Sequence, residues 1–438
     1  MRIAFINSRQ DKAGSNIRYH LEQLLADPAG TWQRPGWTYS FYDTEDRLIH
    51  AAGIDRDLKA DLIIFISRHA STRPSPVLTV HVTGNYRAAE LGGEPGTLAP
   101  ASPAMMQAVL RSLARHCPEG YQVMYEVTHH GPTDILLPSF FVEIGSTEKE
   151  WTDPAAGRAV AESILEAVPI NAVPLIGFGG THYAARETEI ALMSRGAFGH
   201  IAHTREVPFL SSEMIQDMQE KSGAQAAYID RKSLSKKDLS RLVTVLEELA
   251  IPLLSGSEIA AMGNLSWDRY CAVRRMAGEI SHNARCYVHG LEDGPGPLVR
   301  FCANETLLTE TLRCDEPGFI RALDPLPVVH LSTQNGRILP DFITNGSEMQ
   351  KIINDLNTLC VKIIRNNQIT ATEKDHLILA KVRFDPQKAR ELGILAGPLY
   401  QQLAAGQKIS FHGNEITPEM VSSCHETKIH IPGLEKYL

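Results

Sequence analysis

Histidines occur in three short polar segments of the first half of the chain, each directly after an apolar run typical of a strand. Imidazole nitrogens at such positions suit either the binding of a divalent metal ion or general acid–base catalysis near neutral pH. A single histidine is more often a hydrogen-bonded structural residue, so these segments predict a site only if the fold brings them together. The segments are SRHAST with His69, THHGPT with His129 and His130, and GGTHYAARE with His182.

Two glutamates, Glu126 and Glu143, lie on the apolar runs that bracket the histidine pair. A carboxylate could complete a zinc site of nitrogen and oxygen ligands with one open position. The spacing matches no established zinc signature such as H-E-x-x-H. For the histidine pair alone, a hairpin with satisfied polar groups is the simpler interpretation.

Other catalytic patterns are weaker in this sequence. Serines lie near the histidines, but no G-x-S-x-G elbow is present, so a serine or cysteine triad is a weak hypothesis. The run from Gly177 to Thr181 follows a strand and could hold an anion through its backbone N–H groups. It lacks both the P-loop lysine and the dinucleotide-binding spacing, which argues against nucleotide hydrolysis.

The chain must position these segments with the elements that its hydrophobic patterns predict. From residue 1 to about 254 strands alternate with helices, which predicts one α/β domain with a mixed, mostly parallel sheet and flanking helices. Parallel strands end at one edge of a sheet, so the histidine segments could meet over one crevice. We expect Ser15 or Asn16 to cap the first helix and Ser102 to cap a helix from Pro103 to Cys117. The expected strands span residues 2–7, 37–42, 61–67, 79–83, 121–128, 139–144 and 173–178.

The pattern changes after about residue 255. The segment 290–327 is rich in Gly, Pro and Cys, and the alternation of strands and helices is less regular. We therefore predict a second, smaller α+β domain over residues 255–438. Its expected helices span 347–364 and 372–379, and its expected short strands span 409–411 and 428–431.

The composition indicates a soluble cytoplasmic protein. The 438 residues are 43% hydrophobic and 21% charged, no stretch is long and apolar enough for a membrane span, and the N-terminus does not resemble a signal peptide. Seven cysteines without a C-x-x-C pair indicate reduced thiols. The net charge of −8 argues mildly against a broad nucleic-acid surface. The basic run RKSLSKKDLSR at 231–241 is either a solvated helix face or a phosphate contact.

Taken together, several strings resemble the archaeal-type D-aminoacyl-tRNA deacylases, which also occur in plants. The strings are SRQDKAGSNI, SRHAS at 67–71, THHGPTD, PSFFVEIGS and GGTHYAARET, and they follow one another over residues 1–253. The resemblance implies hydrolysis of the ester between a D-amino acid and the 3′ end of tRNA. It also implies zinc dependence and a fold like those of peptidyl-tRNA hydrolases and nucleoside phosphorylases. We expect a monomer that binds the tRNA 3′ end and neither DNA nor a membrane.

The resemblance assigns roles to the motif residues. Zinc would be held by some of His129, His130, His182 and Glu143, and would activate water or polarise the ester carbonyl. Alternatively, metal is peripheral, an RNA hydroxyl assists, and the protein excludes L-amino acids by shape. We expect the N–H groups of Gly179 and Gly180 to stabilise the oxyanion. The catalytic candidates are His129, His130, Thr128 and His69, and the substrate-binding candidates are Ser67, Arg68, Ser71, Gly179, Gly180, Thr181 and Tyr183.

Two further expectations concern the C-terminal extension, residues 255–438, and an alternative function for the protein. The run ELGILAGPLYQQLAAGQKI loosely resembles a piece of the tRNA 3′-processing endonucleases, but the H-x-H-x-D-H ligand string of that fold is absent. We expect residues 255–438 to be an accessory element that helps to hold tRNA. The alternative function is a hydrolase-like or phosphorylase-like protein that binds a nucleoside or peptidyl-tRNA.

Overall fold

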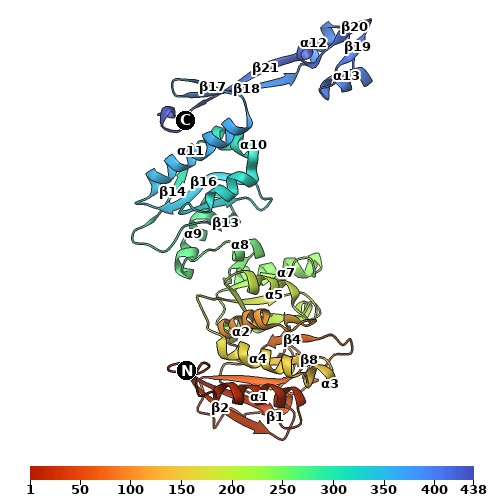
Figure 1. The fold of residues 1–438 in the computed structure, drawn as a ribbon, viewed down its shortest axis with the longest axis vertical. Helices are drawn as coiled ribbons and strands as arrows, with labels where there is room; N and C mark the ends of the chain where they lie inside the picture. Colours follow the sequence, from red (N-terminus) through yellow and green to blue (C-terminus); the bar gives the residue numbers. More distant parts are fainter. The chain divides into compact units, whose positions relative to one another are not determined.

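A computed structural model describes the backbone of all 438 residues and the side chains of all except residues 381–383, 424 and 425. The chain forms two compact units, Met1–Ala261 and Met262–Leu438 (Figure 1). This division falls seven residues beyond the boundary expected after residue 254. Each unit has its own sheets and its own hydrophobic core.

The first sheet of unit 1 has six strands in the order β2-β1-β3-β8-β4-β7. All neighbouring strands are parallel except β8 and β4, which are antiparallel. The central strand β3 carries the run LIIFI, which is buried throughout, as a strand covered on both faces requires. The strands are β1 (Arg2–Ser8), β2 (Thr38–Thr44), β3 (Leu62–Arg68), β4 (Val77–His81), β7 (Gln122–Tyr125) and β8 (Ser139–Gly145).

The second sheet of unit 1 is wholly parallel, in the order β10-β9-β11-β12. The predicted mixed, mostly parallel α/β fold is therefore confirmed, with the strands hydrogen-bonded in two groups. The bounds are β9 (Val173–Phe178), β10 (Gly196–Ala202), β11 (Ala226–Ile229) and β12 (Leu253–Leu254), with a small pair β5 (Gly84–Asn85) and β6 (Thr97–Leu98).

The helices of unit 1 cover both sheets. Helices α1 and α4 pack against each other, and α2 contacts strands of both sheets. The Gln107 side chain on α2 donates to the backbone oxygens of Ala191, Ser194 and Gly196, which fixes this helix against the second sheet. The bounds are α1 (Lys12–Leu25), α2 (Pro103–His116), α3 (Glu148–Trp151), α4 (Pro154–Glu166), α5 (Ala185–Met193), α6 (Ser212–Ser222), α7 (Lys236–Glu248) and α8 (Gly256–Ala260), with short 3-10 turns η1 (Leu48–His50) and η2 (Val207–Phe209).

Two expected helix caps differ from the structure. Helix α1 begins at Lys12, not after Ser15 or Asn16, because Asp11 accepts hydrogen bonds from the N–H groups of Ala13 and Gly14. Ser102 does precede α2, but its side chain makes no capping hydrogen bond.

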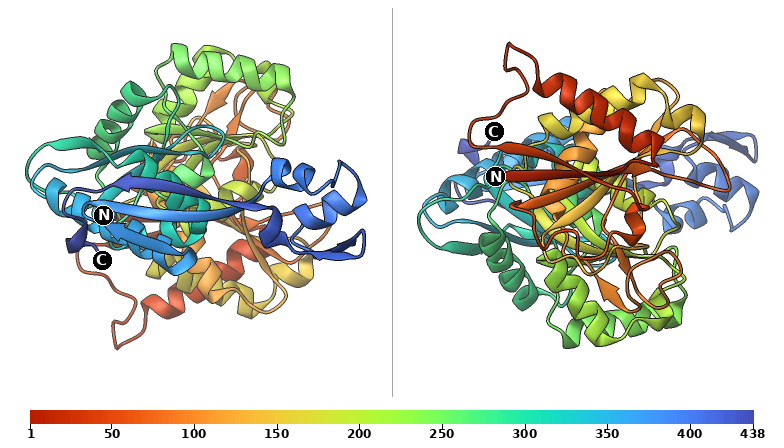
Figure 2. Two further views of the ribbon diagram at one scale, coloured as in Figure 1. Left: turned by 90° about the horizontal axis from the view of Figure 1, so that it is seen from above. Right: turned by 90° about the horizontal axis from the view of Figure 1, so that it is seen from below.

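Unit 2 is built on an antiparallel sheet, β13-β15-β16-β14, and a three-stranded sheet, β17-β18-β21. Helices α10 and α11 pack on each other and share one buried core with these sheets. The long strands β18 and β21 pair as an antiparallel ribbon that leads to a small lobe (Figure 2). The bounds are α9 (Trp267–Ile280), β13 (Arg285–Val288), β14 (Leu298–Cys302), α10 (Glu305–Leu323), β15 (Val328–Ser332), β16 (Ile338–Asn345), α11 (Met349–Asn367), β17 (Thr370–Glu373), β18 (His376–Phe384) and β21 (Ser422–His430).

The small lobe between β18 and β21 has its own apolar core, which includes Ile394, Leu403 and Ile409. It contains α12 (Pro386–Glu391), α13 (Pro398–Ala404), β19 (Ile409–Phe411), β20 (Asn414–Ile416) and η3 (Pro418–Val421). The helix expected over 372–379 is wrong, since this segment forms the end of β17, a turn and the first part of β18. Lys374 takes the left-handed backbone conformation at this turn, which interrupts any helix. Among the described residues, none of the helices is long and apolar enough to span a membrane.

Candidate metal centre between two sheets

The backbone that follows β7 joins the two sheets of unit 1. The N–H of Glu126 donates to Val80 O in the first sheet at 3.1 Å. The N–H groups of the next two residues donate to His182 O at 3.0 Å and to Ile201 O at 2.9 Å, on the side of the second sheet. The Glu126 side chain is therefore held at the seam, where it is 2% exposed.

One face of the first sheet supplies further polar groups to this seam. Glu143 on β8 is paired in register with Ser67 on β3 and with Thr79 on β4. Because side chains alternate along a strand, residues two positions further along β3 and β4 lie on the same face. These residues are His69 and His81, and both are buried.

Glycine is required at position 145, beside His69. A Cβ atom at this position would lie 2.6 Å from the His69 ring. The ring therefore occupies the space that any larger residue would fill, and Gly145 allows His69 to reach the carboxylates.

Glu126 is surrounded by imidazole nitrogens. Although these nitrogens are close, neither carboxylate oxygen of Glu126 receives a hydrogen bond from the described residues. Burial would raise the pKa of Glu126, but the histidines outweigh burial and hold the pKa well below its ordinary value. The distances to the Glu126 oxygens are 2.9 Å from His69 Nδ1, 3.4 Å from His129 Nε2, 3.4 Å from His182 Nε2 and 4.0 Å from His81 Nε2.

The hydrogen bonds of the histidines set their tautomers. His129 Nδ1 lies 2.7 Å from Val127 O, and His130 Nδ1 lies 2.7 Å from Gly131 O. A carbonyl oxygen only accepts, so Nδ1 carries the proton in both rings and Nε2 keeps its lone pair. Burial lowers the pKa of both rings, to about 4 for His130, which favours this neutral form. A neutral imidazole whose second nitrogen donates to a backbone oxygen is the usual form of a metal-binding histidine.

His69 has a different environment. Its Nδ1 faces Glu126 and, at 3.7 Å, Glu143, while its Nε2 lies 3.0 Å from the Tyr183 hydroxyl. Burial would lower the pKa of His69, but the two carboxylates outweigh it and raise the pKa. His69 can therefore hold a proton at Nε2, next to Tyr183.

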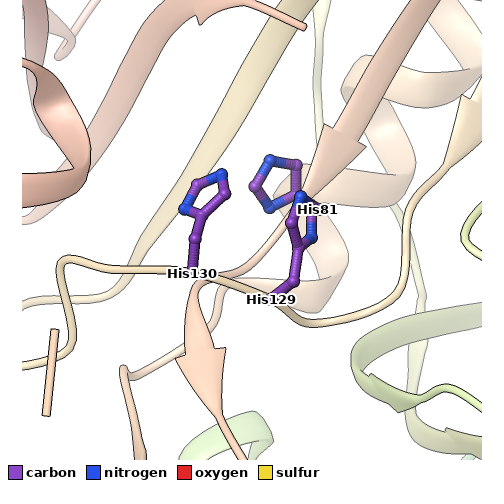
Figure 3. A group of neighbouring side chains, drawn as sticks. All are labelled: His81, His129 and His130. Atoms are coloured by element: carbon purple, nitrogen blue, oxygen red, sulfur yellow. The ribbon is translucent and has the colours of Figure 1, made fainter. Parts of the chain in front are cut away.

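The donor atoms form three overlapping groups in which all atoms lie within 4.8 Å of one another. Figure 3 shows the rings of one group, His81, His129 and His130, gathered together. Nitrogen and carboxylate oxygen donors at this spacing fit a divalent transition metal such as zinc. The buried oxygens of Glu126 and the Nε2 of His81, which lack hydrogen bonds among the described residues, fit the same interpretation. The groups are His81, His129, His130; His69, Glu126, His182; and His81, Glu126, Glu143.

Most of the residues expected in the site do converge. The Ser67 hydroxyl donates to Glu143 at 2.5 Å, and Tyr183 reaches His69. Arg68 lies at the edge of the site, with its guanidinium 5.1 Å from the centre of the Trp151 ring. The residues brought together are Ser67, His69, His129, His130, Glu143, His182 and Tyr183.

Other expected residues are engaged elsewhere. The Thr128 hydroxyl is bonded to His200 and to the N–H of Ile201. The hydroxyl of Ser71 accepts a hydrogen bond from the N–H of Arg73, and that of Thr181 donates to Tyr183 O.

The oxyanion role expected for Gly179 and Gly180 is not supported by the structure. Gly179 N–H already donates to Ala202 O, and Gly180 N–H already donates to the Ser233 hydroxyl, both at 2.9 Å. Both glycines have positive φ angles, so their part is to form this turn. The hairpin interpretation of the histidine pair is also wrong, because β4 lies between β7 and β8.

Two residues of the site were missed in the sequence. His81 is 0% exposed and lies inside the apolar run VLTVHVTG, where it reads as a core residue. Its signal is its position two residues after Thr79, on the face of the sheet that also carries Glu143. Trp151 donates from its indole N–H to His69 O at 2.9 Å, and no local motif marks it.

Two cavities border this centre. The Arg87 pocket has a volume of about 420 Å³ and is lined by residues that include Asn85, Tyr86, Arg87, Arg205 and Glu206. The Trp151 pocket has a volume of about 400 Å³ and is lined by residues that include Leu48, Ile49, Arg68, Phe141 and Trp151. Both are also lined by Leu91, His129, His130 and His182.

Glu187, on α5 behind the glycine turn, is another buried carboxylate outside the centre. It is 0% exposed and neither oxygen has a hydrogen-bond partner among the described residues. Burial, with a smaller contribution from Asp230, raises its pKa from 4.5 to about 8. The folded state therefore binds this proton more tightly than the unfolded state does. The contribution of Glu187 to stability should be fully present below pH 4.5 and should be lost as the pH rises towards 8, by about 1.4 kcal/mol for each pH unit above 4.5.

Replacing Glu187 by Gln should remove this pH dependence. We expect E187Q to become more stable than the parent protein as the pH rises from 5 to 8. Thermal unfolding across this range measures the difference. Glu189→Gln, an exposed change on the same helix, is the control and should follow the parent curve. Parallel curves for E187Q and the parent would contradict the prediction.

Fold and site together define an α/β protein with a histidine–glutamate centre suited to a divalent metal, open to two pockets. Residues 56–254 match the family model described as D-aminoacyl-tRNA deacylase. The chain belongs to this family, because relatives of that name match it from end to end, and the resemblance found in the motifs is confirmed. Two such relatives, each covered completely, are those of Methanoregula boonei, 59% identical, and Methanoculleus marisnigri, 52% identical, both over the whole of this chain.

Shorter relatives correspond to part of the chain. The D-aminoacyl-tRNA deacylase of Methanosarcina mazei is 40% identical, and the match covers 59% of this chain and 93% of that protein. A crystal structure of a conserved protein of unknown function is 32% identical with a TM-score of 0.55, over 59% of this chain and 96% of that one. Proteins of little more than the length of unit 1 therefore exist in this family.

Proposed function

We propose that this protein hydrolyses the ester bond between a D-amino acid and the 3′ end of tRNA, and that its metal is zinc. The observation that carries the proposal is the end-to-end similarity to proteins named D-aminoacyl-tRNA deacylase. The Glu126-centred cluster supports it, since ester hydrolysis needs charge stabilisation and proton transfer at one point. We further propose that the protein acts as a monomer in the cytoplasm, on tRNA and not on DNA or membranes.

The residues of the cluster would divide the work. Zinc would be held by three or four donors drawn from His81, His129, His130, His182, Glu126 and Glu143, which leaves a position open. Zinc bound there would supply a Lewis acid beside the ester. Protonated His69 would pass its proton through the Tyr183 hydroxyl to the ribose oxygen that leaves. Ser67 would hold Glu143 in place through their hydrogen bond.

Release of D-tyrosine from D-Tyr-tRNA tests the proposal. We expect rapid release from D-Tyr-tRNA and little from L-Tyr-tRNA. A chelator should abolish the activity and added zinc should restore it. Full activity in metal-depleted enzyme would exclude the zinc part. Stabilisation by free nucleosides without release of D-tyrosine would instead favour the nucleoside-binding alternative.

The two units would have different roles. We propose that unit 1 carries out catalysis and that unit 2 helps to hold tRNA, which the short Methanosarcina relative supports. Protein truncated after Ala261 should keep the kcat for D-Tyr-tRNA within about 3-fold and raise the KM by about 10-fold, as expected for lost binding that does not touch the reaction. An unchanged KM would contradict the role of unit 2, and a lost kcat would contradict that of unit 1.

A further inference from the structure

We infer that the two pockets divide the substrate: the Trp151 pocket receives the D-amino acid, and the Arg87 pocket receives the terminal nucleotides of the tRNA. The inference rests on the proposed function and states how its substrate lies. An ester joins the amino acid to the ribose, so it must lie where the two pockets meet. The shared wall of the pockets contains His129, His130 and His182, which are the residues beside Glu126.

Apolar side chains in the Trp151 pocket suit an amino-acid side chain, beside polar and charged residues that include Asp11, Arg47 and Arg68. Leu48, Ile49, Phe141 and Trp151 line it. The indole N–H of Trp151 is used by His69 O, so this ring offers the pocket only apolar contact. Apolar walls with a few polar groups are typical of pockets that bind small side chains.

The Arg87 pocket has the groups that a nucleotide requires. Arg87 and Arg205 share the single carboxylate of Glu206, at 2.8 and 3.2 Å, and their side chains are 50% and 73% exposed. Glu90 is the other acid of this pocket. Guanidinium groups at an open rim bind phosphates through paired N–H donors.

A basic surface lies close to the Arg87 pocket. The Arg241 side chain on α7 donates to Leu210 O at 2.8 Å and to Val207 O, so α7 packs on the η2 turn directly after Arg205 and Glu206. The start of this helix and the loop before it carry four exposed cations. Phosphates of a tRNA entering the Arg87 pocket would find them there. The cations are Arg231, Lys232, Lys236 and Lys237.

A change that fills the Trp151 pocket tests whether this pocket receives the D-amino acid. Ile49 is half-buried, so Ile49→Trp adds bulk to the pocket without entering the core. We expect kcat/KM to fall at least about 10-fold for D-Tyr-tRNA and less than about 3-fold for D-Ala-tRNA, because only the larger side chain is excluded. Ile49→Ala should shift the preference in the opposite sense, and it covers the case in which the larger residue disturbs folding.

The control for added bulk is Ile170→Trp, at a residue that is 73% exposed outside both pockets. I170W should leave the ratio of kcat/KM for D-Tyr-tRNA to kcat/KM for D-Ala-tRNA unchanged. Equal losses for both substrates in I49W, together with an unchanged ratio in I49A, would overturn the assignment of the amino acid.

Removing a cation from the Arg87 pocket tests whether this pocket receives the terminal nucleotides of the tRNA. Arg205→Gln should raise the KM about 3- to 10-fold for D-Tyr-tRNA and D-Ala-tRNA alike, and reduce the slope of log(kcat/KM) against log salt by about 1. Arg158→Gln is the control, since Arg158 on α4 pairs with Glu162 and lines neither pocket. A change of amino-acid preference in R205Q, with no change of salt slope, would reverse the two pockets.

Failure of this inference differs from failure of the proposed function. If the parent protein releases no D-tyrosine from D-Tyr-tRNA, the function is wrong and the inference falls with it. If the parent protein is active but the variants do not separate the two substrate halves, only the assignment of the pockets is wrong.

Discussion

Glu126→Gln should lower kcat/KM for D-Tyr-tRNA at least about 10³-fold, which corresponds to about 4 kcal/mol of lost transition-state stabilisation. The glutamine amide has the same shape as the carboxylate but carries no charge. Its nitrogen has no free lone pair and cannot bind a metal ion. Glu126 belongs to two of the three donor groups, and four histidines lie within 4.0 Å of its oxygens. The change therefore removes a donor that two of the three groups share.

The amount of bound metal should also be lower in the E126Q variant. We expect purified E126Q to contain substantially less zinc than the parent protein after dialysis, measured by elemental analysis beside the rate assay. Glu166→Gln is a matched control, because Glu166 also contacts a histidine, His116, at 2.8 Å but lies outside the centre. Normal zinc content and rate in E126Q would show that Glu126 serves only the fold.

The order of elements in unit 1 could be predicted because each strand is short, apolar and bounded by polar turns. The convergence of His69, the histidine pair and His182 could also be predicted, but not for the reason expected. Strand β7 runs antiparallel to β3, so the segments of His69 and of the histidine pair do not follow strands that end at one edge of the sheet. The position of Glu126 at the middle of the centre could not be predicted from the sequence. Glu126 becomes central only because Val127 and Thr128 hydrogen-bond to the second sheet, and no local pattern records which strands a segment will join.

His81 and the glycine turn show two further limits. A histidine within an apolar strand reads as core, and only the placement of β4 between β7 and β8 gives it carboxylate neighbours. Gly179 and Gly180 read as anion-binding amides, but Ala202 O and the Ser233 hydroxyl already accept their hydrogen bonds. Partners so distant in sequence depend on tertiary structure, which hydrophobic periodicity does not specify.

His81→Phe should have the second large effect, on stability as well as activity. The phenyl ring is flat and only moderately larger, and can keep the stacking on Phe141, whose centre lies 5.2 Å from that of the imidazole. The change removes Nε2, which lies 3.6 Å from Glu143 and 4.0 Å from Glu126. In the metal-free protein the two carboxylates raise the pKa of His81, so they then lose a shared positive partner, and breaking such a buried pair costs roughly 3–5 kcal/mol.

Urea unfolding of H81F should therefore show this loss with an unchanged m-value, because the same surface is exposed on unfolding. Hydrolysis of D-Tyr-tRNA and zinc content should fall with it, since His81 belongs to two donor groups. His116→Phe, which removes a half-buried histidine paired with Glu166, is the control and should cost less than about 1 kcal/mol. If H81F is as stable and as active as the parent protein, His81 is a packing residue, and the metal must be held by His69, Glu126 and His182.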